Sequence, residues 1–225
     1  MHSSPAETPP EAPTETLKSF SGVYRSAGRR ARNASILLGV VAFVTLLSMI
    51  QNGSGLRIVD DARAGMLTAK EATNFNRSSV FVGLMYLAAV GACAIAFLGW
   101  LSRSVDNVPA LGGGRPSVTP RWSIGWWFIP FVNLVKPYQI VRDVHDRMGI
   151  GPSSGGGWLL LAWWVSSILG NAIGTFAWRL PEPKNLDALA FLYSIKGTAD
   201  ALTFLGAVLA IFVVLRIQWR AEARA

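Results

Sequence analysis

Four long stretches of this sequence carry almost no charge, and they constrain the fold more than any other feature. They cover about residues 33–50, 78–102, 158–178 and 199–218. A helix needs about 17 to 25 mostly apolar residues to cross the hydrocarbon core of a bilayer. Charged residues make up 15% of the chain, whereas about 25% is usual in soluble domains. The sequence therefore predicts an all-α membrane protein, a polytopic bundle of four transmembrane helices.

The remaining segments add short elements to a single membrane domain. Residues 1–17 contain four prolines and three glutamates but almost no large apolar side chain, so we expect a disordered tail. Residues 18–225 are then one integral membrane domain. Within it, the stretch 20–32 mixes arginines with aromatic residues and predicts an interfacial helix. The stretch 51–77, between the first two spans, predicts one or two short helices.

A fifth apolar segment, at residues 122–147, is built differently from the four spans. Its uncharged part, 122–135, has 14 residues, or about 21 Å of α-helix, against a hydrocarbon core of about 30 Å. Pro130 and Pro137 each remove a backbone donor, and Asn133 lies between them. Irregular backbone at membrane depth is tolerated only against protein or a wet cavity. We therefore expect a Pro-broken re-entrant or interfacial hairpin, with a kinked fifth span as the alternative.

The positions of the cations predict the topology. Fourteen of the 21 Lys and Arg residues lie on one side if there are four spans and the broken segment returns to its starting side. If the broken segment crosses, the cations divide almost evenly. Because positive charge is enriched in cytoplasmic segments, we expect both termini in the cytoplasm. We expect the protein to reside, as a multi-pass protein, in the inner membrane of a bacterium.

Composition argues against several kinds of chemistry. Cys93 is the only cysteine, which excludes an intramolecular disulfide and a thiolate metal cluster. The net charge of +8 comes from cations that flank the apolar stretches, so lipid and topology explain it without a nucleic acid partner. No serine, cysteine or carboxylate pair stands in a catalytic motif. We therefore expect no enzymatic activity, no cofactor and no metal.

The broken segment supplies the candidate functional motif. Its members are Trp126, Trp127, Pro130, Asn133, Pro137 and Tyr138. Transporters and re-entrant pores use broken helices to expose backbone carbonyls or helix ends to a solute. The alternative is a hairpin wedged between spans, in which Asn133 caps backbone groups that the break leaves without partners.

The third apolar stretch carries a Gly-x-x-x-Gly motif formed by Gly170 and Gly174, with Asn171 between them. Small residues at this spacing allow helix backbones to approach closely, and a polar amide can hydrogen-bond across the contact. The motif predicts helix packing, either within the chain or between chains. A contact between Asn171 and a solute is the alternative.

Two further ionisable residues accompany the apolar segments. His145 has Asp143 and Asp146 close in sequence, but no metal-ligand spacing is present, so we interpret the three as charges on an amphipathic helix. His145 also has the residue type expected of a pH-sensitive group. Asp200 lies at the start of the fourth stretch, where we favour an interfacial cap over a proton relay.

Several aromatic, proline and asparagine motifs carry a family resemblance. They are Leu-Gly-Trp-Leu-Ser-Arg at 98–103, Asn107, Trp-Ser-Ile-Gly-Trp-Trp-Phe-Ile-Pro at 122–130, Asn133 with Leu134, Pro137 with Tyr138, and Trp163 with Trp164. With these motifs the chain resembles bacterial integral membrane proteins of the domain of unknown function 4328 family, over about residues 30–218. His145 and Val135 depart from the family pattern, which often has Trp or another aromatic residue there. The resemblance implies the membrane architecture and implies no activity, cofactor or ligand.

These observations lead to three hypotheses about function. The first is a non-enzymatic scaffold or regulatory partner in the lipid bilayer, which associates with a second copy or another membrane protein through the Gly-x-x-x-Gly face. The second is a small transporter or channel with its solute path at Asn133. The third is a membrane sensor that uses His145 or the N-terminal tail.

Overall fold

The computed structural model describes residues 20–149 and 155–225, and in these ranges it contains helices and no strand. The tail predicted at residues 1–17 lies outside the described residues. The four longest helices are α1 (Gly28–Arg63), α2 (Ala69–Ala110), α5 (Gly157–Arg179) and α6 (Leu186–Glu222). Each is long and apolar enough to cross a membrane. The prediction of an all-α protein with four membrane-spanning helices is therefore confirmed.

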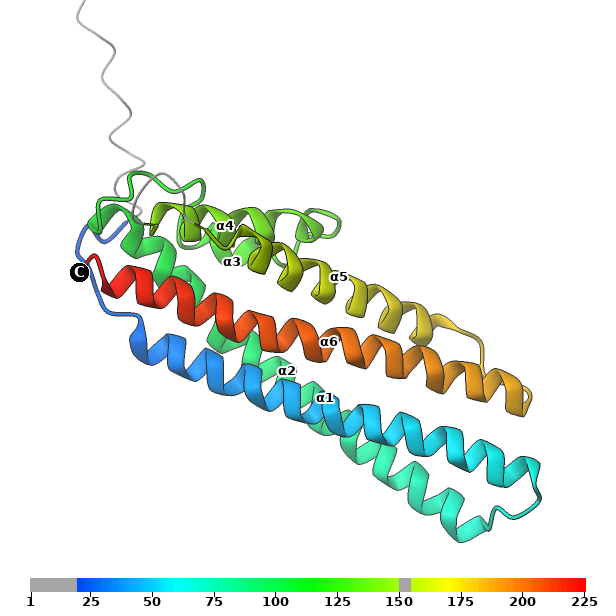
Figure 1. Ribbon diagram of the computed structural model, residues 1–225. Helices are drawn as coiled ribbons and strands as arrows, with labels where there is room; N and C mark the ends of the chain where they lie inside the picture. Colours follow the sequence, from blue (N-terminus) through cyan, green and yellow to red (C-terminus); the bar gives the residue numbers. More distant parts are fainter. Residues whose placement is uncertain (1–19, 150–154) are drawn as a thin grey trace, which may run out of the picture.

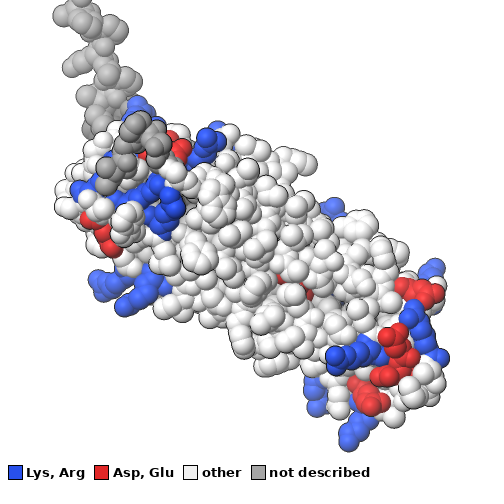
Figure 2. Space-filling model, viewed as in Figure 1, with Lys and Arg blue, Asp and Glu red and all other residues white. Residues whose placement is uncertain are grey.

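The four long helices lie side by side in an arc rather than in a closed ring. α1 packs against α2 on one side and α6 on the other, and α5 packs against the far side of α6 (Figure 1). Charged residues gather mainly at the two ends of the bundle, and a broad band that shows only a small acidic patch lies between them (Figure 2). This distribution is what a bilayer requires, because charges are costly in hydrocarbon.

The helices extend well beyond the apolar stretches. α1 continues to Arg63, and after a turn in which Gly65 has a φ of 69°, α2 begins at Ala69. Thr68 and Glu71 form a capping box at that start. The prediction of separate short helices within 51–77 was wrong, because intrahelical hydrogen bonds and the cap let the spanning helices continue past the membrane.

The segment before α1 also differs from the prediction. Residues 20–27 are not helical, and α1 begins at Gly28. The side chain of Asn107 accepts a hydrogen bond from the backbone N–H of Arg25 at 3.2 Å and donates one to the Arg25 carbonyl at 2.9 Å. The backbone of this segment is thus paired with α2 rather than with itself, which explains why no interfacial helix forms there.

The Pro-broken segment folds as a hairpin between α2 and α5. It contains α3 (Trp122–Gly125), the short 3₁₀ helix η2 (Val132–Leu134) and α4 (Lys136–Arg147). It begins and ends at the end of the bundle where the C-terminus lies, and its closed end points along α5 (Figure 1). Pro137 lies in the first turn of α4, where a missing N–H costs nothing. This proline therefore helps to start a helix.

The densest part of the core lies where α4 meets the long helices. Ile140, Val141 and Val144 of α4 are at most 1% exposed, and Trp100 and Leu101 of α2 are fully buried. The terminal carbonyls of α4 accept hydrogen bonds from two arginines of α6. Arg220 donates to the carbonyl of His145 at 3.0 Å, and Arg224 donates to that of Arg147 at 2.9 Å. Cations suit this position because the C-terminus of a helix carries partial negative charge.

Candidate functional site

The closed end of the hairpin, residues 128–135, is here called the apex. Its centre is Phe131, whose φ of 63° and ψ of −40° are rare for a residue with a side chain. The N–H of Val132 donates to the carbonyl of Pro130 at 2.7 Å, which closes a tight three-residue turn of the strained γ type. The Phe131 side chain is 84% exposed, so this strain is not offset by burial of its ring.

The apex is attached to the bundle through aromatic side chains. The indole N–H of Trp164 donates to the carbonyl of Leu134 at 3.0 Å. The ring of Trp127 contacts Phe97 of α2 and Trp164 of α5, with ring centres 5.6 and 5.9 Å apart. Trp127 thus connects both helices that flank the hairpin, as expected of a wedge.

The other predicted motif residues lie along the arms of the hairpin. Trp126 is half-buried, stacks against Trp122 with ring centres 5.1 Å apart, and lies 5.9 Å from the ammonium group of Lys136. Pro137 is buried and Tyr138 is half-buried. Only Pro130 and Asn133 of the predicted motif lie at the apex. The six residues therefore divide into a structural group and an apex pair.

An open groove of about 600 Å³ runs between the apex and α5. We call it the apex groove. Its lining residues are Pro130, Phe131, Asn133, Leu134, Ile168, Asn171, Ala172, Thr175, Phe176 and Arg179. The structure thus brings together Asn133 and Asn171, which come from two motifs that the sequence keeps 38 positions apart. Asn171 lies about 21 Å along α5 from its first residue, in a helix that is long and apolar enough to cross a bilayer about 30 Å thick.

The two amides differ in their partners. The Asn171 amide donates to the Ser167 carbonyl in its own helix at 3.1 Å, and its oxygen accepts no hydrogen bond among the described residues. The Asn133 side chain makes no hydrogen bond within the part of the chain that the structure describes. The interpretation of Asn133 as a cap for the broken backbone is therefore wrong, because the freed backbone groups pair with one another.

The glycine motif lies on a different face of α5 from the groove. A Cβ atom on Gly170 would lie 2.8 Å from the Thr203 hydroxyl and 3.1 Å from the Thr203 backbone nitrogen, both in α6. A Cβ atom on Gly174 would lie 3.8 Å from the Ala199 side chain. The close approach that the motif predicts is therefore made within the chain, at Gly170, and α6 occupies this face.

His145 occupies a closed position at the end of α4. Its side chain is fully buried, its Nδ1 lies 2.9 Å from a carboxylate oxygen of Asp146, and its Nε2 has no partner among the described residues. Burial lowers the pKa of this imidazole below its usual value, and the positive charge of Arg220 acts in the same direction. The ring is therefore neutral at neutral pH. No group of three potential metal ligands occurs among the described residues.

Asp200 is a residue whose place the sequence did not reveal. α6 begins at Leu186, capped by the side chain of Asn185, so Asp200 lies inside the helix and the interpretation as a cap was wrong. Its carboxylate accepts a hydrogen bond from the Asn52 amide of α1 at 2.8 Å. The sequence did offer one signal, a single acidic residue in an apolar stretch, because such residues are normally paired with another polar or charged group.

The apex groove offers amide groups, a hydroxyl, the guanidinium of Arg179 and apolar surface. These groups support hydrogen bonding and packing, and they include neither a carboxylate nor a histidine. No curated protein and no solved structure matches the chain. A family model described as Domain of unknown function (DUF4328) matches residues 63–219, which include α2, the hairpin, the groove, α5 and most of α6, but only the last residue of α1. The chain belongs to the DUF4328 family.

Proposed function

We propose that this protein is a non-enzymatic membrane partner protein that binds a transmembrane helix of another protein in the apex groove. The observation that carries the proposal is the Asn133 amide, which has no hydrogen bond among the described residues and lines the apex groove. A polar amide in hydrocarbon is costly unless it is paired. A second helix relieves this cost, because side chains such as Asn, Ser and Thr hydrogen-bond across helix contacts.

The apolar rim supports the same proposal. Phe128, Phe131 and Phe176 are 73%, 84% and 54% exposed, and they lie around or beside the groove. A helix with small residues on one face would cover these rings and approach the two amides. The proposal uses the apex groove rather than the Gly-x-x-x-Gly face, because α6 of the same chain already covers Gly170.

The proposed topology places the groove within the membrane. We infer that the hairpin re-enters from the cytoplasmic side of the inner membrane and that both termini lie in the cytoplasm. The position of both hairpin ends beside the C-terminal end of α6 supports this inference, as does the excess of cations at that end. Single cysteines at Arg142 and Glu222, both exposed positions, in a Cys93→Ser background test it, since both should react with thiol reagents only from the cytoplasm.

Photocrosslinking in intact membranes tests the proposed function. A photoreactive phenylalanine analogue at Phe131 should form an adduct with one defined membrane protein. The matched control is the same analogue at Phe81 of α2, a ring that is 63% exposed but lies outside the groove. Asn133→Leu should abolish the Phe131 adduct. Adducts with lipid alone would contradict the proposal, as would adducts with the same proteins at both positions. An adduct between two copies of this chain would mean that the groove binds a second copy instead of another protein.

A small transporter is the second candidate, and the two amides on one groove favour it. In that case purified protein in liposomes would move an ion or polar solute, and Asn133→Ala would abolish the flux. Asn171→Ala should then reduce it as well, because both amides line the same groove. Flux that is unchanged in both variants would remove this candidate.

The sensor hypothesis depends on His145. Because burial lowers its pKa, protonation would need a pH below the usual range of histidine. An acid response that persists in His145→Gln would remove the pH form of this hypothesis. The form that uses the N-terminal tail concerns residues outside the described part of the chain.

A further inference from the structure

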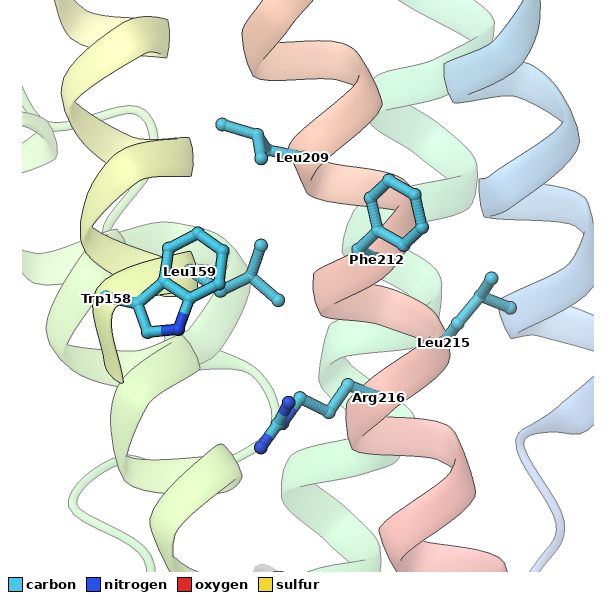
Figure 3. Close-up of a pocket in the computed structure, with 6 residues that line it drawn as sticks. All are labelled: Trp158, Leu159, Leu209, Phe212, Leu215 and Arg216. Carbon is cyan, nitrogen blue, oxygen red and sulfur yellow. The ribbon is translucent and has the colours of Figure 1, made fainter. Parts of the chain in front are cut away.

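A second groove lies on another face of the bundle, between the start of α5 and the end of α6. It has a volume of about 480 Å³, and we call it the Trp158 groove. Its lining residues are Trp158, Leu159, Leu209, Phe212, Leu215 and Arg216. Figure 3 shows the apolar side chains along its length and the guanidinium of Arg216 at one end, pointing toward the α5 side. The groove is therefore amphiphilic, with one cation at the end of an apolar trough.

The Arg216 guanidinium is held in place by backbone. It donates to the carbonyl of Gly155, and it lies so close to Gly156 that a Cβ atom there would come within 2.6 Å of its Cζ. Gly156 has a φ of 110°, a conformation that glycine readily adopts. The side chain is thus fixed across the groove end instead of extending freely into water.

The charge of Arg216 has no anionic partner in the described part of the chain. No carboxylate lies within 4.0 Å of it, and its Nε is buried without a hydrogen bond. Arg220 lies one turn further along α6, and like charges at this spacing repel each other. Arg220 is already engaged with the carbonyls of His145 and Gly155. Two cations at this end of the groove therefore outnumber the carboxylate of Asp146, which acts on Arg220.

We propose that the Trp158 groove binds one anionic phospholipid, with its phosphate on Arg216 and an acyl chain along Leu209 and Phe212. Basic sites between transmembrane helices bind anionic headgroups. Tryptophan favours the headgroup level of a bilayer, and the Trp158 side chain is 71% exposed. A zwitterionic lipid would leave the excess charge of Arg216 uncompensated. A soluble phosphate would leave the apolar walls unused. This site is independent of the apex groove and of the function proposed for it.

Native mass spectrometry of the full chain tests the site. The probes are phosphatidylglycerol and phosphatidylcholine with the same acyl chains. The wild-type protein should retain one phosphatidylglycerol in preference to phosphatidylcholine. Arg216→Gln should reduce that binding about fivefold, the equivalent of roughly 1 kcal/mol for one cation near the headgroups. Arg216→Lys should keep most of it. Phe212→Ser should weaken binding of both lipids, because it shortens an apolar wall.

The matched control is Arg29→Gln, because Arg29 is an exposed arginine of α1 at the same end of the bundle. It should leave lipid binding unchanged. Equal retention of the two lipids by wild type, or equal losses in Arg216→Gln and Arg29→Gln, would overturn the proposal. Displacement by glycerol phosphate, which has no acyl chain, would overturn it in favour of a phosphate-only site. If Arg216→Gln does not fold, the comparison of Arg216→Lys with Phe212→Ser still separates headgroup from chain contacts.

Discussion

The two parts of the hairpin differ in how they are held. The arm formed by α4 is buried, with Ile140 and Val141 at most 1% exposed, whereas Phe131 at the apex is 84% exposed. The arm receives hydrogen bonds from Arg220 and Arg224 of α6. The apex receives one side-chain hydrogen bond, from Trp164. The difference indicates that the arm fixes the position of the hairpin, whereas the exposed apex is available for the contact proposed above.

The largest expected effect tests the packing of the buried core. Trp100→Ala should lower the free energy of unfolding by about 3–5 kcal/mol, because it empties a large, fully buried site in the core. Unfolding by dodecyl sulfate in mixed micelles measures it. Trp178→Ala is the control, since that ring is 85% exposed, and it should change stability by less than about 0.5 kcal/mol. Similar losses in the two variants would contradict a core centred on the arm.

The next effect tests the arginine that caps α4. Arg220→Gln should cost about 1–3 kcal/mol, because it leaves the buried carbonyl of His145 without its donor. It should also increase the accessibility of a cysteine placed at Val144 to thiol reagents. Arg142→Gln removes only an exposed pair with Asp146 and should cost less than about 1 kcal/mol. An unreactive Val144 position in Arg220→Gln would mean that packing alone holds the arm.

A third pair tests whether α5 is a rigid wall for the apex. Gly170→Ala should destabilise by about 1–3 kcal/mol, because its Cβ would overlap with Thr203. Gly174→Ala should stabilise by about 0.4–1 kcal/mol, because its Cβ fits and alanine restricts the unfolded chain. The same micelle unfolding experiment measures both changes. If both variants change the free energy of unfolding in the same direction, Gly170 does not make the close contact between α5 and α6.

The smallest expected effect concerns the apex itself. Phe131→Gly should raise the free energy of unfolding by up to about 1 kcal/mol, because glycine adopts a positive φ without strain. Phe128→Gly should lower it by about 0.5–1 kcal/mol, since Phe128 has no positive φ and glycine adds chain entropy. A loss of stability in Phe131→Gly would mean that the ring supports the fold, and the contrast between arm and apex would fail.

Much of the architecture could be predicted from the residues. The four uncharged stretches correspond to α1, α2, α5 and α6, because only helices of that length cross a bilayer without unpaired backbone. Pro130 lies in the interruption between α3 and α4, as the sequence predicts, whereas Pro137 lies in the first turn of α4. The ends of the helices were less predictable. Residues 51–63 are polar enough to suggest a loop, yet α1 continues through them because a helix in water still satisfies its own hydrogen bonds.

The sequence predicted individual residues of the candidate site but not that they lie together. Asn133 and Asn171 were each singled out, but for separate reasons, and nothing in their spacing predicts that they line one groove. The excess charge at Arg216 was invisible as well, because it depends on which carboxylates fail to reach it. The first feature arises from the contact between the apex and α5, and the second from the contact between the start of α5 and the end of α6, which are remote in sequence.

The sequence by itself determined that this chain is an integral membrane protein with four spans and a broken segment between the second and third. Hydrophobic length and proline chemistry act locally, so they can be read along the chain. Only the tertiary structure decided that Gly170 packs on α6, that the hairpin fills the space between α2 and α5, and that Asn133 lies beside Asn171. These outcomes depend on which helix faces meet, and many facing arrangements bury apolar stretches equally well.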